Sequence, residues 1–268
     1  PHNNWNLMQA RYIMNIGMVL EDNEHYADGK GRGYYINYVL NQSSIRQWSL
    51  KKLAEYGYDP QTGVWAECPG YSSVVLNDYT SFTTLFDRNL RFDLTQALPV
   101  IPRAVAVMPQ YLFPNRMVCG FGDTHPSFLS TTPMKRMIQN AQTNNKPEQE
   151  AYFTALLKCL DPVAGKTGDT SKPPVAITSF FEDKPLELNP DVQAGRIEDY
   201  VSPFFYAPNV SWLVQRNGMN PQHSLMVSVN GSMGNHMHAN GISMELYGKG
   251  YVLGPDAGIG QYLYSGLD

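Results

Sequence analysis

Two histidines stand two residues apart near the end of the chain, and a carboxylate follows them. His236 and His238 precede an alternating segment, so both side chains project from one face of an extended strand. Asp256 comes after the next turn. Two imidazoles and a carboxylate suit zinc, which usually takes four ligands, so a further ligand must come from elsewhere. A hydrogen-bonded pair of surface histidines beside a turn aspartate is the alternative that this spacing leaves open.

The elements around these histidines are predicted to be strands. Residues 224–233 alternate apolar Leu225, Val227 and Val229 with polar side chains, and residues 242–247 alternate in the same way. The run 248–250, Gly-Lys-Gly, separates this segment from Tyr-Val-Leu at 251–253, which is typical of a hairpin. We therefore expect an antiparallel sheet in the last part of the chain.

The first part of the chain is predicted to be helical, because apolar residues recur there at helical spacing. Three helix faces are expected, the second ending at Gly57 and the third starting after Pro147: Leu7, Ala10, Met14; Ile45, Trp48, Leu53, Tyr56; Ala151, Ala155, Leu156, Cys159. Between them a proline-rich segment should break any long helix into short pieces. The Gly- and Pro-rich stretch 161–174 reads as a boundary or surface loop.

Composition excludes some classes of protein. The 268 residues carry 20 basic and 24 acidic side chains, a net charge of −4, which argues against a nucleic-acid partner. No apolar run is long enough to span a membrane. The 17 Tyr, 11 Phe and 4 Trp suit sugar rings as well as protein cores. The three cysteines, Cys68, Cys119 and Cys159, form no CxxC pair and do not fix the compartment.

The stretch NHMHANGISMELYGKGYVLGPDAG at 235–258 resembles the strand-hairpin segment of the heparinase II/III-like polysaccharide lyases, a family that includes alginate lyases. By this resemblance His236 is the catalytic histidine, while His238 and Asp256 hold a structural zinc or similar divalent metal whose remaining ligand lies outside this chain. Asn240 stands where many members carry Asp, which affects the local hydrogen bonds.

Two further landmarks follow the family's order in the helical part. HNNWN at residues 2–6 resembles a helix start whose asparagine contacts the substrate carboxylate; Asn4 is assigned this role, with Asn3 and Trp5 as neighbouring substrate contacts. GVWAECPGY at 63–71 resembles a motif that ends in a catalytic tyrosine, which is Tyr71, and Thr62 replaces its usual Asp. A third segment, FPNRMVCGFGD at 113–123, resembles a connection that ends in Gly-Asp.

The remaining candidates are assigned with their alternatives open. A tyrosine from the sheet joins the site in family members, and Tyr262 is preferred here over Tyr264. Glu67 is a candidate substrate contact or an exposed carboxylate at a helix start. Arg216 is a candidate partner of an anionic sugar or a solvated charge at a strand edge.

The alternative for Tyr71 is a core aromatic whose hydroxyl is hydrogen-bonded, although the resemblance favours catalysis. The alternative for one of the two asparagines is a helix N-cap. The metal on this reading does no redox or hydrolytic chemistry and fixes the strand that carries His236.

The resemblance implies an α+β protein that cleaves a uronic-acid polysaccharide by β-elimination. Residues 1–165 would form the C-terminal part of an α/α toroid and residues 166–268 the start of an antiparallel β-sandwich, so that the chain is a fragment of a larger one. The substrate class implies secretion or export to the periplasm. Two rival hypotheses are a metal-dependent glycan hydrolase and a non-catalytic glycan-binding protein of the same fold. The sequence leaves the particular uronate, endo or exo action and the oligomeric state undetermined.

Overall fold

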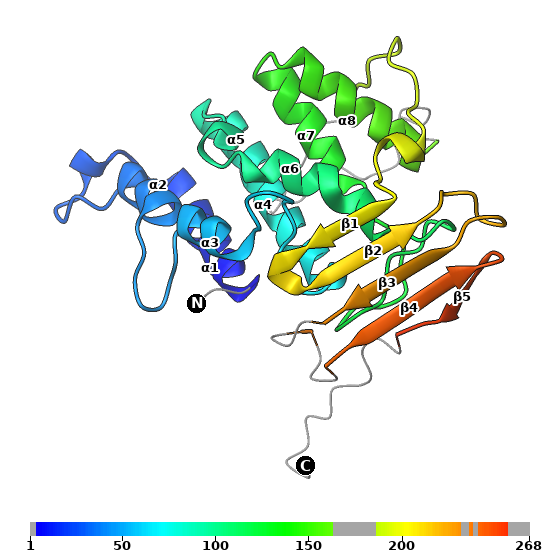
Figure 1. Cartoon of the computed structure of the whole chain (residues 1–268). Helices are drawn as coiled ribbons and strands as arrows, with labels where there is room; N and C mark the ends of the chain where they lie inside the picture. Colours follow the sequence, from blue (N-terminus) through cyan, green and yellow to red (C-terminus); the bar gives the residue numbers. More distant parts are fainter. Residues whose placement is uncertain (1–3, 163–185, 232–235, 238–240, 257–268) are drawn as a thin grey trace. The chain divides into compact units, whose positions relative to one another are not determined.

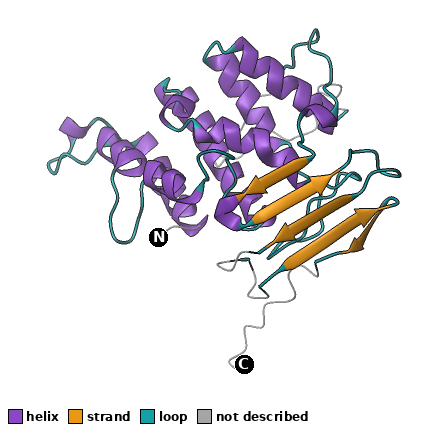
Figure 2. Ribbon diagram, in the orientation of Figure 1, coloured by secondary structure: helices purple, strands orange, loops and turns teal. Residues whose placement is uncertain are grey.

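The computed structural model shows helices followed by an antiparallel sheet (Figures 1 and 2) and describes residues 4–162, 186–231, 236–237 and 241–256. The helices are α1 Asn4–Val19, α2 Arg32–Asn41, α3 Leu50–Gly57, α4 Pro69–Leu90, α5 Leu94–Ala97, α6 Val100–Val107, α7 Thr132–Thr143 and α8 Pro147–Leu160. The strands are β1 Phe204–Ala207, β2 Trp212–Arg216, β3 Met226–Asn230, β4 Ser243–Gly248 and β5 Tyr251–Gly254. The predicted α+β order is confirmed.

The chain divides into two compact units that interleave in sequence. The helical unit contains Pro1–Gly63, Val74–Val107 and Ser130–Tyr200, and the sheet unit contains Val64–Ser73, Met108–Leu129 and Val201–Asp268. Two segments from the first half of the chain, one of which holds the first turn of α4, therefore group with the strands. The domain boundary predicted at 165/166 falls outside the described residues and stays a prediction.

Helix α1 buries the face that its spacing predicts. Leu7, Ala10 and Met14 are fully buried, whereas Trp5 is 63% exposed. Helix α8 begins at Pro147, as expected, although its buried residues are centred on Phe153 and Leu157 rather than on the alanines. Pro147 suits the first helical turn because its missing N–H would have had no intrahelical partner.

The second predicted helix is shorter than the apolar spacing indicates. Helix α3 ends at Gly57, as predicted, but it begins only at Leu50, so the assignment of Ile45 and Trp48 to it is wrong. The hydroxyl of Ser49 accepts a hydrogen bond from the Lys52 N–H and caps the helix there. Ile45 is 90% exposed in the preceding turn, so its apolar character does not reflect burial.

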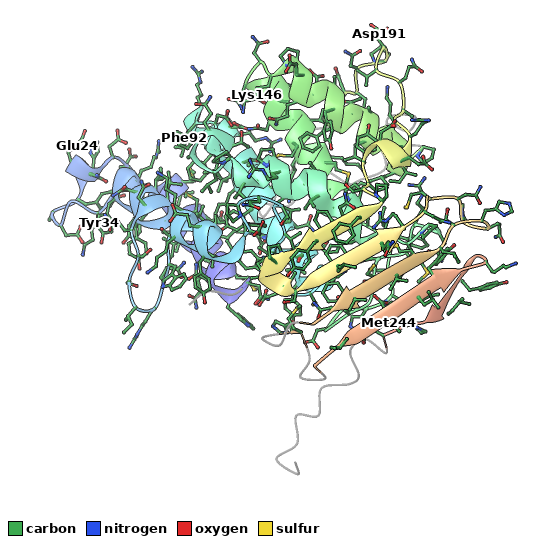
Figure 3. The ribbon with its side chains drawn as sticks, in the orientation of Figure 1. Glu24, Tyr34, Phe92, Lys146, Asp191 and Met244 are labelled. Atoms are coloured by element: carbon green, nitrogen blue, oxygen red, sulfur yellow. The ribbon has the colours of Figure 1, made fainter. Side chains whose placement is uncertain are left out.

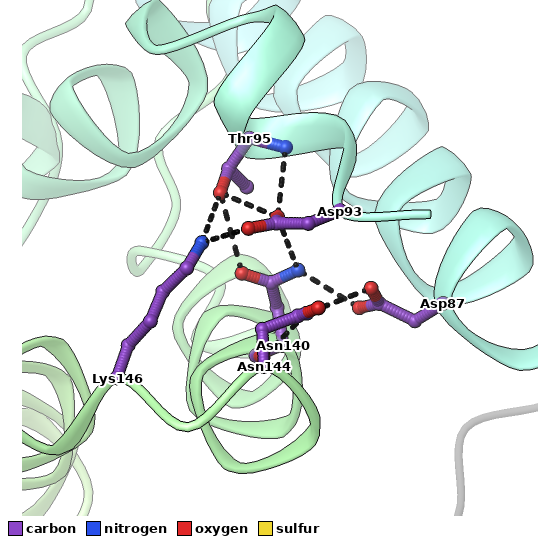
Figure 4. A network of polar contacts seen from close by, with 6 residues as sticks. All are labelled: Asp87, Asp93, Thr95, Asn140, Asn144 and Lys146. Atoms are coloured by element: carbon purple, nitrogen blue, oxygen red, sulfur yellow. Dashed lines mark hydrogen bonds and ion pairs between the residues drawn. The ribbon is translucent and has the colours of Figure 1, made fainter. Parts of the chain in front are cut away.

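The proline-rich segment forms short helices, as expected. The four-residue α5 and the eight-residue α6 are followed by the 3₁₀ turn η2, Met108–Tyr111. The last turns of α4 and α7 and the start of α5 share a polar network, drawn in Figure 4. We call this network the clasp; its members are Asp87, Asp93, Thr95, Asn140, Asn144 and Lys146.

The five strands lie side by side in the order β1-β2-β3-β4-β5, each antiparallel to its neighbour (Figure 1). The predicted hairpin joins β4 to β5 through Lys249 and Gly250. Both residues have positive φ, 55° and 90°, as a two-residue type I′ turn requires. The strand prediction for this region is confirmed.

One face of the sheet is buried and the other is exposed, and the alternation of polar and apolar residues does not show which is which. The polar set of β3 and β4 is the buried one: Ser228 accepts from the Trp212 indole, the Asn230 amide donates to the Val210 carbonyl, and Glu245 is 2% exposed. The apolar set points the other way, and Met244 on β4 is 64% exposed (Figure 3). The buried face is covered within the sheet unit by Met108–Leu129, through contacts such as that of Phe113 with Tyr247.

Candidate active site

Tyr71 lies in the first turn of α4, in the part of that helix that belongs to the sheet unit. Its neighbours fix this turn: the Gly70 N–H donates to the Thr124 hydroxyl, and the Ser72 hydroxyl donates to the Glu67 carbonyl. The side chain is half-buried. The helix start therefore holds the tyrosine firmly while leaving part of its ring accessible.

His236 lies directly against Tyr71. The two rings are stacked, with 3.5 Å between their centroids and 12° between their planes. The Nδ1 atom of His236 is 2.7 Å from Oδ2 of Asp123, and the His236 carbonyl accepts a hydrogen bond from the Asp123 N–H at 2.9 Å. The structure thus brings together two predicted catalytic residues, Tyr71 and His236, that are far apart in the sequence.

The backbone at this point is unusual. His236 has φ of 62°, in the left-handed region that residues with a side chain seldom adopt. Gly122 has φ of 66°, and a Cβ there would stand 2.2 Å from the His236 carbonyl oxygen and 2.7 Å from Cβ of Cys68. Only glycine fits this position, because both its conformation and its closest neighbours exclude a side chain. The turn is therefore built for a close approach to His236.

Asp123 was not assigned a role from the sequence. It ends the segment FPNRMVCGFGD, which the sequence identifies only as a connection. The available signal was the dipeptide Gly122-Asp123, since a glycine before a carboxylate favours a tight turn that presents the side chain. We refer to Tyr71, His236 and Asp123 together as the Tyr–His–Asp site.

The buried carboxylate of Glu245 is hydrogen-bonded to the segment that leads into the Gly122-Asp123 turn. Both carboxylate oxygens of Glu245 accept from the Gly120 N–H, at 2.9 and 3.0 Å. Burial raises the pKa of Glu245 to about 7, although hydrogen bonds from the backbone N–H groups of Gly120 and Asp256 oppose the shift. A cavity of about 240 Å³ lies beside these groups and is lined by residues of the sheet unit, including Thr124, Tyr251 and Asp256.

Glu67 and Arg216 are both buried in the sheet unit. Glu67 is 5% exposed, and its carboxylate accepts a hydrogen bond from the Trp65 indole at 2.7 Å. Arg216 is 4% exposed, and its guanidinium donates a hydrogen bond to the Gln110 carbonyl at 2.7 Å. Burial lowers the pKa of Arg216 to about 10. These contacts give each residue a structural role, and their contact with substrate stays a prediction.

The asparagine-rich start of α1 is partly described. Asn4 is half-buried at the first residue of α1 in the helical unit, and Trp5 beside it is exposed. Asn6 is buried instead, with its amide donating to the Trp48 carbonyl at 2.9 Å and accepting from the Trp48 N–H at 2.8 Å. Asn3 lies outside the described residues, as does Tyr262. The assignment of Asn4 to substrate stays a prediction.

The predicted metal ligands are described only in part. His238 lies outside the described residues. Asp256 is described, and its carboxylate accepts a hydrogen bond from the Ser243 hydroxyl. Within residues 4–162, 186–231, 236–237 and 241–256, no three His, Cys, Asp or Glu side chains gather closely enough to hold a metal ion. A carboxylate suits a divalent cation, but the described residues supply this one predicted ligand, so metal binding stays a prediction.

The fold and the site define a class of protein: a helical unit and a unit with an antiparallel sheet, the latter holding a tyrosine, a histidine and a carboxylate in contact. Comparison with known proteins agrees with this class. A family model described as "Endo-acting ulvan lyase 2nd domain" matches residues 61–188. These residues include Tyr71 and Asp123.

Solved structures extend the likeness to nearly the whole chain. A heparinase III with methylated lysines has a TM-score of 0.56 at 17% identity, over 97% of this chain and 32% of its own. A second heparinase III structure gives 0.57 at 16% identity, over 97% of this chain and 33% of its own. No curated protein matches the sequence.

The chain thus spans about a third of the length of these heparinase III structures. At 16–17% identity their likeness to this chain is one of fold. Together with the family match, it agrees with the resemblance to heparinase-like polysaccharide lyases drawn from the sequence.

Among the described helices, none combines the length and the apolar character that crossing a membrane would require.

Proposed function

We propose that this chain carries part of the active site of a polysaccharide lyase that cleaves a uronic-acid polysaccharide by β-elimination. The observation that carries the proposal is the stacking of Tyr71 on His236, together with the contact between the Asp123 carboxylate and Nδ1 of the imidazole. A tyrosine and a histidine in contact, each with a partly accessible side chain, supply the two proton-transfer groups that this reaction needs.

The reaction removes the proton from the carbon next to the uronate carboxylate. The electron pair of that C–H bond forms a carbon–carbon double bond, the bond to the glycosidic oxygen breaks, and a proton is returned to that oxygen. Because the carbon acid is very weak, the carboxylate must first be neutralised by hydrogen bonds that strengthen as charge develops. The proposal assigns this role to Asn4 and the two proton transfers to Tyr71 and His236.

The stacked geometry limits how these two residues can work. Hydrogen-bonding atoms of both rings lie in the ring planes, and parallel planes about 3.5 Å apart do not let one ring donate in-plane to the other. Tyr71 and His236 therefore act on different atoms of the substrate rather than passing a proton between themselves. One takes the proton from carbon and the other serves the leaving oxygen.

The substrate is proposed by class alone, as an acidic polysaccharide or oligosaccharide. Export to the periplasm or the cell exterior follows from that class, since large acidic glycans lie outside the cytoplasm. The decisive experiment incubates the full-length protein with a panel of heparan-type, alginate and ulvan polymers. We expect products that absorb in the ultraviolet, because elimination leaves a double bond conjugated to the carboxylate.

The rival functions predict other outcomes of the same panel. A metal-dependent hydrolase gives saturated products, and that result would overturn the elimination. A glycan-binding protein binds oligosaccharide without turnover. The contacts of His236 with Tyr71 and Asp123 favour catalysis over binding alone. Sugar binding does not require a carboxylate that holds Nδ1 of the imidazole.

The metal is proposed as a structural zinc or similar divalent ion. His238 and Asp256 would hold it together with a further ligand, and it would fix the strand end near His236. The test measures the metal content of the purified full-length protein by mass spectrometry. We expect about one equivalent of metal per chain in the wild type and clearly less in Asp256→Ala. Wild-type protein that was purified without a chelator and contains no metal would contradict the assignment.

A further inference from the structure

We propose that Asp123, held in place by Gly122, is the positioning residue that sets the tautomer and the orientation of His236. The inference rests on the proposed function for its kinetic part, but its structural part stands without it. Asp123 meets His236 twice: its carboxylate lies 2.7 Å from Nδ1, and its N–H donates to the His236 carbonyl at 2.9 Å. One residue therefore orients both the side chain and the backbone of the histidine.

The carboxylate decides which imidazole nitrogen carries the proton. An ionised carboxylate can only accept hydrogen bonds, so the nitrogen that faces it must be the donor. That nitrogen is Nδ1, which leaves the lone pair of the neutral ring on Nε2. Proton transfer to or from the substrate is thereby assigned to Nε2 of His236.

The ring cannot escape this arrangement by rotating in place. Tyr71 covers one face of the imidazole at 3.5 Å, so a flip of the ring must first open the stack. The left-handed φ of His236, 62°, is supported by the backbone bond from Asp123. Tyr71 thus fixes one face of the His236 ring, and Asp123 fixes its Nδ1 edge and its backbone.

Gly122 is part of the same device. Its missing side chain lets the turn approach so closely that a Cβ would stand 2.2 Å from the His236 carbonyl oxygen. Without that approach the Asp123 N–H could not reach the carbonyl and the carboxylate would move away from Nδ1. The dipeptide Gly122-Asp123 therefore couples a backbone requirement to a side-chain requirement.

The first measurement is the tautomer of His236 in the wild-type full-length protein. Nitrogen-15 NMR of the neutral imidazole distinguishes a protonated Nδ1 from a protonated Nε2, and the His236→Gln variant identifies the signal. We expect Nδ1–H to predominate. Predominance of Nε2–H in the wild type overturns the inference, and this outcome depends on no variant that has to fold.

The second measurement compares Asp123→Asn and Asp123→Ala with a matched control, Asp28→Asn, which changes an exposed carboxylate paired with Lys30. Loss of the carboxylate should lower the Nδ1–H population in both Asp123 variants and reduce kcat by about 10²–10⁴-fold with KM nearly unchanged. A structural role alone would not move the tautomer of a protein whose thermal unfolding is unaltered.

The failures of the two proposals are distinguishable. If the protein eliminates but both Asp123 variants keep the wild-type tautomer and kcat within twofold, the positioning role is wrong and the lyase function stands. If no polymer is cleaved while the tautomer shifts as expected, Asp123 positions His236 and the proposed reaction is wrong.

Discussion

The clasp and the Tyr–His–Asp site both contain buried or half-buried carboxylates, but the surroundings of these carboxylates differ. In the clasp of the helical unit every carboxylate is met by donors: Asp87 accepts from the amides of Asn140 and Asn144, both at 2.8 Å, and Asp93 pairs with Lys146 (Figure 4). In the Tyr–His–Asp site, the Asp123 carboxylate meets an imidazole whose side chain is 26% exposed and which stacks on the half-buried Tyr71. Satisfied groups stabilise a fold, whereas exposed hydrogen-bonding groups on a fixed frame are suited to act on a ligand.

The pKa shifts of the clasp show how closely its groups are matched. Burial raises the pKa of Asp87, although the amides of Asn144 and Asn140 partly oppose the shift. Burial acts in the same direction on Asp93, but hydrogen bonds from Lys146, Thr95 and Asn140 outweigh it and lower the pKa of Asp93. Changes in the clasp should therefore affect stability, and changes in the site should affect activity.

The largest effect is expected for Tyr71→Phe. The variant loses one hydroxyl and keeps the ring that stacks on His236, so the fold should be unchanged while kcat falls by about 10²–10⁴-fold. Tyr12→Phe is the matched control, because Tyr12 is an exposed tyrosine of α1. Initial rates followed by ultraviolet absorbance measure both. Equal rates in the two variants would remove Tyr71 from the chemistry.

Gly122→Ala should lower both activity and stability. The left-handed φ costs about 1–2 kcal/mol for alanine, and the contact with the His236 carbonyl adds to that. Gly29→Ala is the control for the backbone term alone, since Gly29 has the same φ of 66° and nothing within 4 Å of its Cβ position. Urea unfolding of both variants isolates the contact; identical losses of stability would mean that the turn yields without strain.

Asp93→Ala should destabilise the protein by about 2–4 kcal/mol, because it leaves Lys146 and Asn140 without their carboxylate partner in a largely buried setting. The lyase rate of the folded variant should stay within about twofold of wild type. Denaturant unfolding and steady-state kinetics test the two halves of this statement. A large loss of kcat in a fully folded sample would break the contrast between the regions.

The smallest effect is a difference in pH dependence between two clasp variants. Because the pKa of Asp93 is lowered on folding, its stabilisation is present above the unfolded value of about 3.9 and is lost as pH falls through the folded value. The raised pKa of Asp87 has the opposite sign, so its contribution is lost as pH rises through the folded value. Relative to wild type, Asp93→Asn should lose stability and Asp87→Asn should gain it as pH rises from about 3 to 6. If the difference in unfolding free energy from wild type changes in the same direction for both variants, one of the two assignments is wrong.

Local patterns in the sequence predicted much of the fold. The buried face of α1, the start of α8 at Pro147 and the turn at Lys249-Gly250 each depend on a few neighbouring residues, and each is confirmed. The start of α3 was misplaced because the apolar Ile45 and Trp48 continue the helical spacing while Ser49 caps the helix after them. A side-chain cap overrode the periodicity there.

The rest required tertiary information. The alternation in β3 and β4 separates a polar face from an apolar one, but it does not show which face is covered by another part of the chain. In the structure, Met108–Leu129 covers the polar face. Tyr71 and His236 were chosen by resemblance, and their contact became visible only in the fold. Asp123 was missed because its role depends on a turn of Gly122 toward a residue distant in sequence.

The central claim is that His236, stacked on Tyr71 and held by Asp123, takes part in an elimination. The most direct test follows ultraviolet absorbance while full-length wild type and His236→Ala act on the same acidic polysaccharide. The account predicts absorbing, unsaturated ends from the wild type and a rate at least about 10²-fold lower from the variant. Equal rates from the two proteins, or saturated ends from the wild type, would contradict it.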